Sequence, residues 1–193
     1  TDSVASDQTI TKVVDGTTLQ YNEQASAVDD TITLTMADAA GSADSLTLKL
    51  AEDTTGATAS NDMGEVAAAG VETININSTA GTGNSTTTRN TVDLTDAAAS
   101  GLQTLNVTGN VALTSVVSST TLTTIDAGAS TVTGTNGMII TATGTTKATT
   151  VTGSSADDTF NLGSNVDTVD GGGGDDIINT YSGADSINGG VGN

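Results

Sequence analysis

The sequence predicts an all-β protein, a parallel β-solenoid or β-roll with very little helix. Short segments alternate apolar with polar residues, which is the pattern of strands that bury one face. About a fifth of the residues are Thr, which is β-branched and favours strands. Related segments recur along the chain, first at irregular intervals and then every nine residues, as is typical of solenoids.

Residues 1–65 form the first predicted region, a set of β-strands. In "DDTITLTM" the apolar residues Ile32, Leu34 and Met36 share one face, and "DSLTLKL" repeats the pattern. Hairpins and parallel coils both suit these strands. This region is therefore either a unit of its own or continuous with the coils that follow.

Helix is expected in two short places at most. "NDMGEVAAAG" (61–70) offers the one plausible helical turn, and "DAAAS" (96–100) is a weaker candidate. The first is short and the second is shorter still.

Residues 66–152 form the second predicted region, which carries a recurring motif of the form apolar–x–Thr–apolar–polar–apolar. Its copies are "VETINI" (71–76), "LQTLNV" (102–107), the looser "LTTIDA" (122–127) and a degenerate "ATTVTG" (148–153). Short strands at such intervals predict the coils of a β-solenoid. An antiparallel sandwich is the alternative, because its short strands also follow one another closely.

Residues 153–193 form the third region, which is built on a nine-residue repeat. From Gly153 the pieces are "GSSADDTFN", "LGSNVDTVD", "GGGGDDIIN" and "TYSGADSIN", followed by "GGVGN". The sixth position is always acidic, at Asp158, Asp167, Asp176 and Asp185. The eighth position is always apolar, at Phe160, Val169, Ile178 and Ile187.

This pattern matches G-G-x-G-x-D-x-U-x, a calcium-binding β-helix repeat of six turn residues and three strand residues. Two repeats complete one coil, so residues 18 apart should stack. Glycines let each turn bend until its carbonyls converge, and the aspartate adds anionic oxygen. Calcium needs six to eight oxygen ligands, which two stacked turns can supply together.

The stacking predicts which turns share calcium ions. Turn 153–158 should pair with turn 171–176 through Asp158 and Asp176, and turn 162–167 with turn 180–185 through Asp167 and Asp185. A third pair, 171–176 with 189 onward, should be incomplete. The other candidate metal-binding positions are Gly153, Ser155, Ser164, Gly171, Gly172, Gly173, Gly174, Ser182, Gly183 and Gly189.

The repeats are imperfect, and only "GGGGDDIIN" matches the pattern fully. Turn 171–176 is therefore the best ligand set, and 162–167 the poorest. The alternative is a series of solvated Gly/Asp turns without metal. An EF-hand is excluded because the chain has no D-x-[DN]-x-[DN]-G loop.

Composition narrows the possible functions. The formal net charge is -19, with 23 acidic and four basic residues, so neither nucleic acid nor an anionic membrane surface is an expected partner. No apolar run is long enough for a transmembrane helix. The absence of His and Cys removes Ser–His–Asp and Cys–His catalysis, and no enzymatic activity is expected.

The nonapeptides resemble those of the RTX family of type I secreted proteins. More loosely, residues 69–193 are similar to the C-terminal part of RTX-bearing S-layer proteins and of large surface adhesins. The resemblance implies type I secretion, several Ca²⁺ ions that drive folding outside the cell, and self-association into a surface lattice. It also allows a cell-surface polysaccharide as a partner, through regions outside this chain.

The same resemblance implies calcium sites outside the repeats. Candidates are Asp30 and Asp44, each leading into an apolar strand, and Asp126 in "IDAGAS". Plain turn or capping roles are the alternative for all three. The chain is expected to be a piece of a longer protein, and an adhesin segment or the accessory domain of a secreted RTX enzyme are the alternative functions.

Overall fold

The structure is a computed structural model, which describes residues 7–21, 31–38, 41, 43–51, 62–80, 88–96 and 101–192. All regular structure in these residues is β, which confirms the predicted fold class. The helical turn expected at 61–70 is wrong, because Asp62–Ala69 is a strand whose Met63, Val66 and Ala68 enter the core. The second helical candidate lies outside the described residues except for Asp96.

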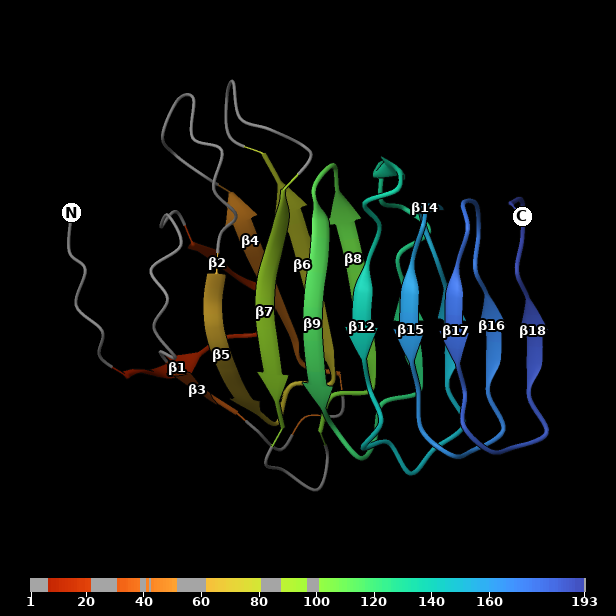
Figure 1. The fold of residues 1–193 in the computed structure, drawn as a ribbon. Coiled ribbons are helices and arrows are strands. Elements are labelled where there is room, and N and C mark those ends of the chain that lie inside the picture. Colours follow the sequence, from red (N-terminus) through yellow and green to blue (C-terminus); the bar gives the residue numbers. More distant parts are fainter. Residues whose placement is uncertain are drawn as a thin grey trace.

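Two eight-stranded sheets make up the fold (Figure 1). The first sheet contains, in spatial order, β1 (Gln8–Val13), β3 (Thr31–Met36), β5 (Asp62–Ala69), β7 (Arg89–Thr95), β9 (Ala112–Ser118), β12 (Ile139–Thr141), β15 (Thr159–Asn161) and β17 (Ile177–Asn179). The second sheet contains β2 (Thr17–Tyr21), β4 (Ser45–Ala51), β6 (Thr73–Thr79), β8 (Thr104–Gly109), β10 (Thr124–Asp126), β13 (Thr150–Thr152), β16 (Thr168–Asp170) and β18 (Ser186–Asn188). A small third sheet pairs β11 (Thr133–Gly134) with β14 (Ser155–Ala156).

Every strand pair is parallel, and successive long strands alternate between the two large sheets. Each coil therefore gives one strand to each sheet, and the chain advances from one end of the roll to the other (Figure 1). This arrangement excludes the antiparallel sandwich and the N-terminal hairpins. Both sheets continue across the expected boundaries at residues 65 and 152.

The recurring motif corresponds to one coil. Thr73 of its first copy pairs with Thr104, Thr104 with Thr124, and Thr124 with Thr150, so all four copies stack in the second sheet. In the nonapeptides, Thr159 pairs with Ile177 and Thr168 with Ser186, which confirms the predicted 18-residue coil.

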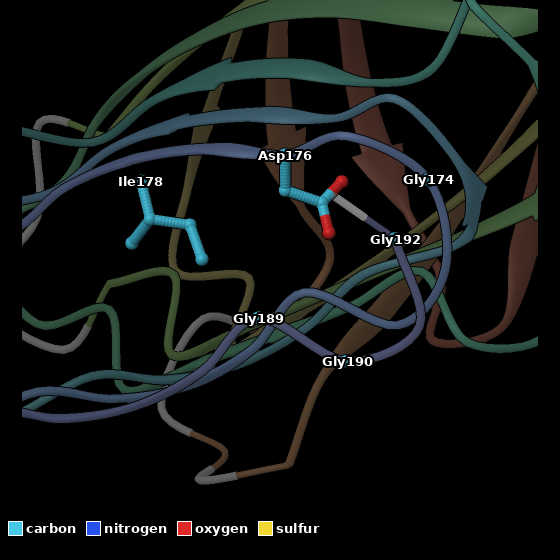
Figure 2. A pocket seen from close by; sticks show the side chains of 6 residues that line it. All are labelled: Gly174, Asp176, Ile178, Gly189, Gly190 and Gly192. Atoms are coloured by element: carbon cyan, nitrogen blue, oxygen red, sulfur yellow. The ribbon is translucent and has the colours of Figure 1, made fainter.

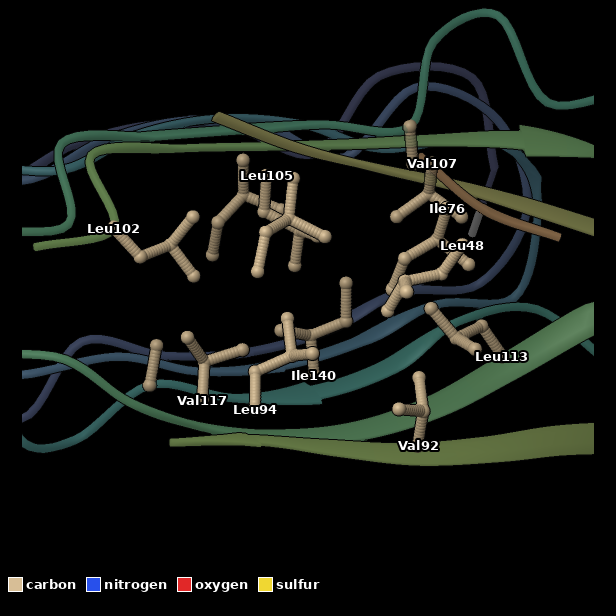
Figure 3. Close-up of a cluster of buried hydrophobic side chains, with 14 of the residues drawn as sticks. Leu48, Ile76, Val92, Leu94, Leu102, Leu105, Val107, Leu113, Val117 and Ile140 are labelled. Carbon is tan, nitrogen blue, oxygen red and sulfur yellow. The ribbon is translucent and has the colours of Figure 1, made fainter. Parts of the chain in front are cut away.

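The core is a thin layer between the two sheets. Leu48, Ile76 and Leu105 from the second sheet face Leu94 and Ile140 from the first (Figure 3). The strands alternate buried with partly exposed residues, as one buried face requires. The described part of the chain contains no helix with the length and apolar character needed to cross a membrane.

Candidate metal-binding turns

The sixth-position aspartates lie in two rows, each just before a strand. Asp158 and Asp176 precede β15 and β17 of the first sheet, whereas Asp167 and Asp185 precede β16 and β18 of the second. The main-chain N–H of Asp158 donates to Asp176 Oδ1 at 2.9 Å, and that of Asp167 donates to Asp185 Oδ1 at 2.9 Å. The structure thus brings together both aspartate pairs that the repeat spacing predicts.

In each row, one carboxylate oxygen of an aspartate accepts a hydrogen bond from the main chain of the preceding coil. The Thr149 N–H continues the pattern by donating to Asp167 Oδ1 at 2.8 Å. Hydrogen bonds from main-chain N–H groups to a carboxylate are strong because the acceptor is charged. These bonds fix the orientation of each carboxylate and so determine where its second oxygen lies.

The second oxygen of two aspartates is left without a partner. Asp167 Oδ2 and Asp176 Oδ2 are both buried and accept no hydrogen bond. Burying an unpaired anionic oxygen is costly, and such atoms call for a partner that the protein chain does not supply. A cation would meet that need, so the residues fit a metal ion at each row.

Asp176 lines a cavity at the C-terminal end of the roll (Figure 2). The cavity has a volume of about 150 Å³, ample for an ion with bound water. Its lining residues are Gly174, Asp176, Ile178, Gly189, Gly190 and Gly192. The turn pair expected to be incomplete, 171–176 with 189 onward, therefore surrounds this cavity.

Asp158 is bound differently from Asp176. Its Oδ1 accepts the Met138 N–H at 2.6 Å, and its Oδ2 accepts the Ser154 N–H at 2.7 Å. The Ser154 hydroxyl contacts both oxygens at 3.1 Å. Asp158 is thus satisfied by the protein, and it meets Asp176 through its main chain. Ser154 stands where the repeat has glycine, and its hydroxyl is a donor that the repeat pattern does not reveal.

Burial raises the pKa of three of these carboxyl groups above the usual value of 3.8. Burial is the main cause for Asp158, whose hydrogen bonds from Met138 and Ser154 and nearby Arg89 act in the opposite direction. The pKa of Asp167 is raised by burial and by the charge of Asp185, against its hydrogen bonds from Thr149.

The pKa of Asp176 is raised first by burial, while its hydrogen bond from Asp158 opposes the shift. The negative charges of Asp158, Asp157 and Asp175 raise it further. A row of carboxylates that disfavours its own ionisation is a row that a divalent cation would stabilise.

The turn glycines allow adjacent coils to touch. Gly172 and Gly174 have φ of 92° and 100°, which non-glycine residues rarely adopt. A Cβ at Gly172 would strike the Ser154 carbonyl, and one at Gly171 would strike Asp176 Oδ2. Gly183 is held in the same way against the Asn165 carbonyl. These glycines are needed for coil contact whether or not a metal binds.

The remaining nonapeptide candidates differ in burial. Gly153 is buried, and a Cβ there would lie 2.8 Å from Asp158 Oδ2, whereas Gly173 is partly exposed. The exposed candidates are Ser155, Ser164, Ser182 and Gly189. Within the described residues, no three acidic side chains are arranged so that they could hold one metal ion together. The other ligands of an ion would therefore be main-chain or hydroxyl oxygens and water.

The three candidate metal ligands outside the nonapeptides differ in their burial and hydrogen bonding. Asp30 lies outside the described residues. Asp126 is exposed and accepts the Gly128 N–H at 2.9 Å, which is a local turn contact. Asp44 has a buried Oδ2 without a hydrogen-bond partner, and so has Glu72 at Oε1.

Glu72 was missed because it lies in the strand motif and not in a nonapeptide. A signal for it exists in the sequence. "ETIN" at 72–75 and "DTVD" at 167–170 share the order acidic–Thr–apolar–polar, and both sets lead into strands of the second sheet.

The chain was also compared with known proteins. No family model, no curated protein and no solved structure matches it. The functional assignment consequently depends on the β-roll and on the chemistry of its turns.

Proposed function

We propose that this chain is a calcium-stabilised structural segment of a secreted bacterial surface protein of the S-layer type. One observation carries the proposal. Asp167 and Asp176 each bury a carboxylate oxygen that has no hydrogen-bond partner, in turns that face the neighbouring coil. Several Ca²⁺ ions, bound in such turns at both edges of the roll, satisfy these oxygens and clamp adjacent coils together.

Calcium is the cation that best suits these turns. The available ligands are carboxylate, carbonyl and hydroxyl oxygens, which calcium prefers. The sequence contains no His and no Cys, so the nitrogen and sulfur ligands that favour zinc or copper are lacking. Calcium also accepts the irregular geometry and high coordination number that main-chain turns impose, whereas magnesium demands a near-ideal octahedron.

Calcium would also make folding depend on location. A site with a dissociation constant of about 10⁻⁴ M gains about 1.4 kcal/mol in about 1 mM calcium. Several sites in one roll add several such increments. In calcium-poor cytosol the chain, with a net charge of -19, gains nothing from them and repels itself. Folding after type I secretion follows from this difference.

A structural role, without catalysis, suits the outer faces of the roll. Polar side chains form ladders along them, as in the bond from Asn106 Nδ2 to Asn75 Oδ1 at 2.8 Å and that from Asn179 to Asn161 at 2.7 Å. Such ladders stiffen a sheet without providing a concave, apolar binding site. We propose self-association into a lattice as the use of these faces.

Calcium counting tests the metal sites. Equilibrium dialysis followed by elemental analysis should show several bound ions in the wild-type chain and at least two fewer in the D167N/D176N variant. Asp175→Asn serves as the matched control, because it removes one charge from an exposed side chain of the same turn. Equal calcium content in all three proteins would refute the metal assignment.

Electron microscopy in calcium separates the surface functions. Ordered two-dimensional sheets support the S-layer assignment. Monodisperse rods support the adhesin segment or the accessory domain of a secreted enzyme, and would overturn the lattice while leaving the calcium sites intact.

A further inference from the structure

One column of the roll consists of the residues that directly precede the strands of the second sheet from β4 onward. The register pairs Ser45 with Thr73, Thr73 with Thr104, and so on to Ser186, so the preceding residues stack as well. The members of this entry column are Asp44, Glu72, Gln103, Thr123, Thr149, Asp167 and Asp185. The column is acidic at both ends and neutral in the middle.

The N-terminal pair repeats the geometry of the C-terminal pair. Glu72 Oε2 accepts the main-chain N–H of Asp44 at 2.8 Å, just as Asp185 Oδ1 accepts that of Asp167 at 2.9 Å. In both places a carboxylate of one coil caps the column residue of the coil before it. The acidic side chain is therefore oriented by the same device in a segment that contains no nonapeptide.

The N-terminal pair also leaves oxygens unpartnered. Glu72 is only 4% exposed, and its Oε1 has no hydrogen-bond partner. Asp44 Oδ2 is likewise buried and unpartnered. The neutral column members Gln103, Thr123 and Thr149 leave no such atom. The unpaired oxygens thus occur where the column is acidic, at both of its ends.

Glu72 is buried and Asp44 is partly buried, and within the described residues no cation is paired with their two unpartnered oxygens. Lys49 lies in β4, five residues after Asp44, which corresponds to about 16 Å along an extended strand. Leaving a buried anion uncompensated costs several kcal/mol. Gly41 approaches the Asp44 carboxylate closely, since a Cβ there would lie 2.7 Å from Asp44 Oδ2.

We propose that Asp44 and Glu72 hold a divalent cation of the calcium class, which joins the coil of β4 to the coil of β6. The ligands are oxygens only, and no third acidic side chain completes a cluster within the described residues. Main-chain oxygens and water fill the remaining positions, which suits a site of modest affinity. This site is independent of the nonapeptide turns and can exist without them.

Ion counting in a variant background isolates the site. In the D167N/D176N chain, calcium measured by equilibrium dialysis and elemental analysis should fall by one ion per chain when Glu72→Gln is added. Gln keeps an acceptor for the Asp44 N–H while removing the charge. Glu65→Gln, in β5 of the first sheet, is the matched control and should lose none. Unchanged calcium content on adding Glu72→Gln would overturn the proposal.

Hydrogen exchange in the unmodified chain gives a second test, which does not depend on whether a variant folds correctly. Added calcium should slow amide exchange at least several-fold in peptides covering 43–51 and 71–80, beyond any change in 101–120. No change in the first two peptides, together with slowing in 153–192, would contradict the proposed site at Asp44 and Glu72 and remain consistent with the proposed function. Slowing at 43–51 and 71–80 alone would support the site at Asp44 and Glu72 and contradict the nonapeptide sites.

Discussion

Asp176 combines two opposed interactions in one side chain. Its Oδ1 is anchored by the Asp158 N–H, and its Oδ2 is buried beside a cavity without a partner. The first interaction stabilises the coil with or without metal, whereas the second destabilises it unless a cation is present. Replacing the carboxylate should therefore have effects of opposite sign in the two conditions.

The Asp176→Asn variant tests this directly. In chelator it should unfold at a higher temperature than wild type, because an uncompensated charge is removed while an acceptor for Asp158 remains. In about 1 mM calcium it should be less stable than wild type by up to about 1.4 kcal/mol, or about 3–6 °C of the midpoint, less whatever it gained in chelator. Thermal unfolding followed by circular dichroism measures both shifts. Asp175→Asn removes a charge that repels Asp176 but leaves the buried oxygen in place, so it should show a smaller rise in chelator and no comparable loss in calcium. A fall in chelator would contradict the account.

The raised pKa values of Asp158, Asp167 and Asp176 predict how the metal-free protein responds to pH. A folded-state pKa above the unfolded one means that the folded state binds the proton more tightly. The resulting stability is complete below the unfolded pKa of about 4 and is lost as pH rises through the folded pKa values. In chelator, the unfolding midpoint should therefore fall as the pH rises above about 4.

Two comparisons make the pH measurement specific. The D167N/D176N variant should show a shallower decline, since general charge repulsion is retained and two raised groups are gone. Asp15, whose pKa is lowered by hydrogen bonds from Ser45, acts with the opposite sign below about pH 4. A metal-free midpoint that rises as the pH is raised above about 4 would show that the buried carboxylates do not govern stability.

At the scale of single elements, the turns depend on particular glycines. Gly172→Ala should destabilise the roll by at least about 1–2 kcal/mol, because φ is 92° and the new Cβ would strike the Ser154 carbonyl. Gly173→Ala is the natural control, since its nearest atom would be 3.6 Å away. Urea unfolding in chelator compares the two. Equal stabilities would mean that coil contact does not constrain this turn.

The strands depend on their buried eighth-position residues, but not equally. Phe160 is 0% exposed and Ile187 is 51% exposed, although both occupy the same repeat position. Phe160→Ala should cost about 3–5 kcal/mol, whereas Ile187→Ala should remain within about 1 kcal/mol. Urea unfolding measures both, and similar losses would show that burial does not decrease toward β18.

Much of the fold was predictable at this scale because each coil repeats the same local pattern. The three-residue strands and the stacking of Phe160 on Ile178 follow directly from the nonapeptide spacing. The region 61–70 was not predictable, because Gly64 and its alanines favour a turn locally while pairing with β3 and β7 imposes a strand.

The candidate site was predictable only in part. Repeat spacing correctly brings Asp167 near Asp185 and Asp158 near Asp176. It does not show which oxygen is left over, because that depends on whether a neighbour such as Ser154 donates a hydrogen bond. The order acidic–Thr–apolar–polar marks Glu72 as a position like Asp167, but its burial was not predictable, since it arises from stacking against Asp44 in a coil 28 residues earlier.

Across the whole molecule, charge and core vary along the roll. The middle coils bury a continuous apolar layer and carry neutral residues in the entry column. Near the last strands the core becomes exposed, as Ile187 shows, and acidic turns take over the contacts between coils. The C-terminal coils should therefore depend on calcium more than the middle ones do.

The most direct test of the central claim is far-ultraviolet circular dichroism of the whole chain, titrated with calcium and then with a chelator. The account predicts that calcium strengthens the β signal and raises the unfolding midpoint, that the chelator reverses both changes, and that equimolar magnesium has a much smaller effect. A β signal and a midpoint that stay the same throughout the titration would contradict it.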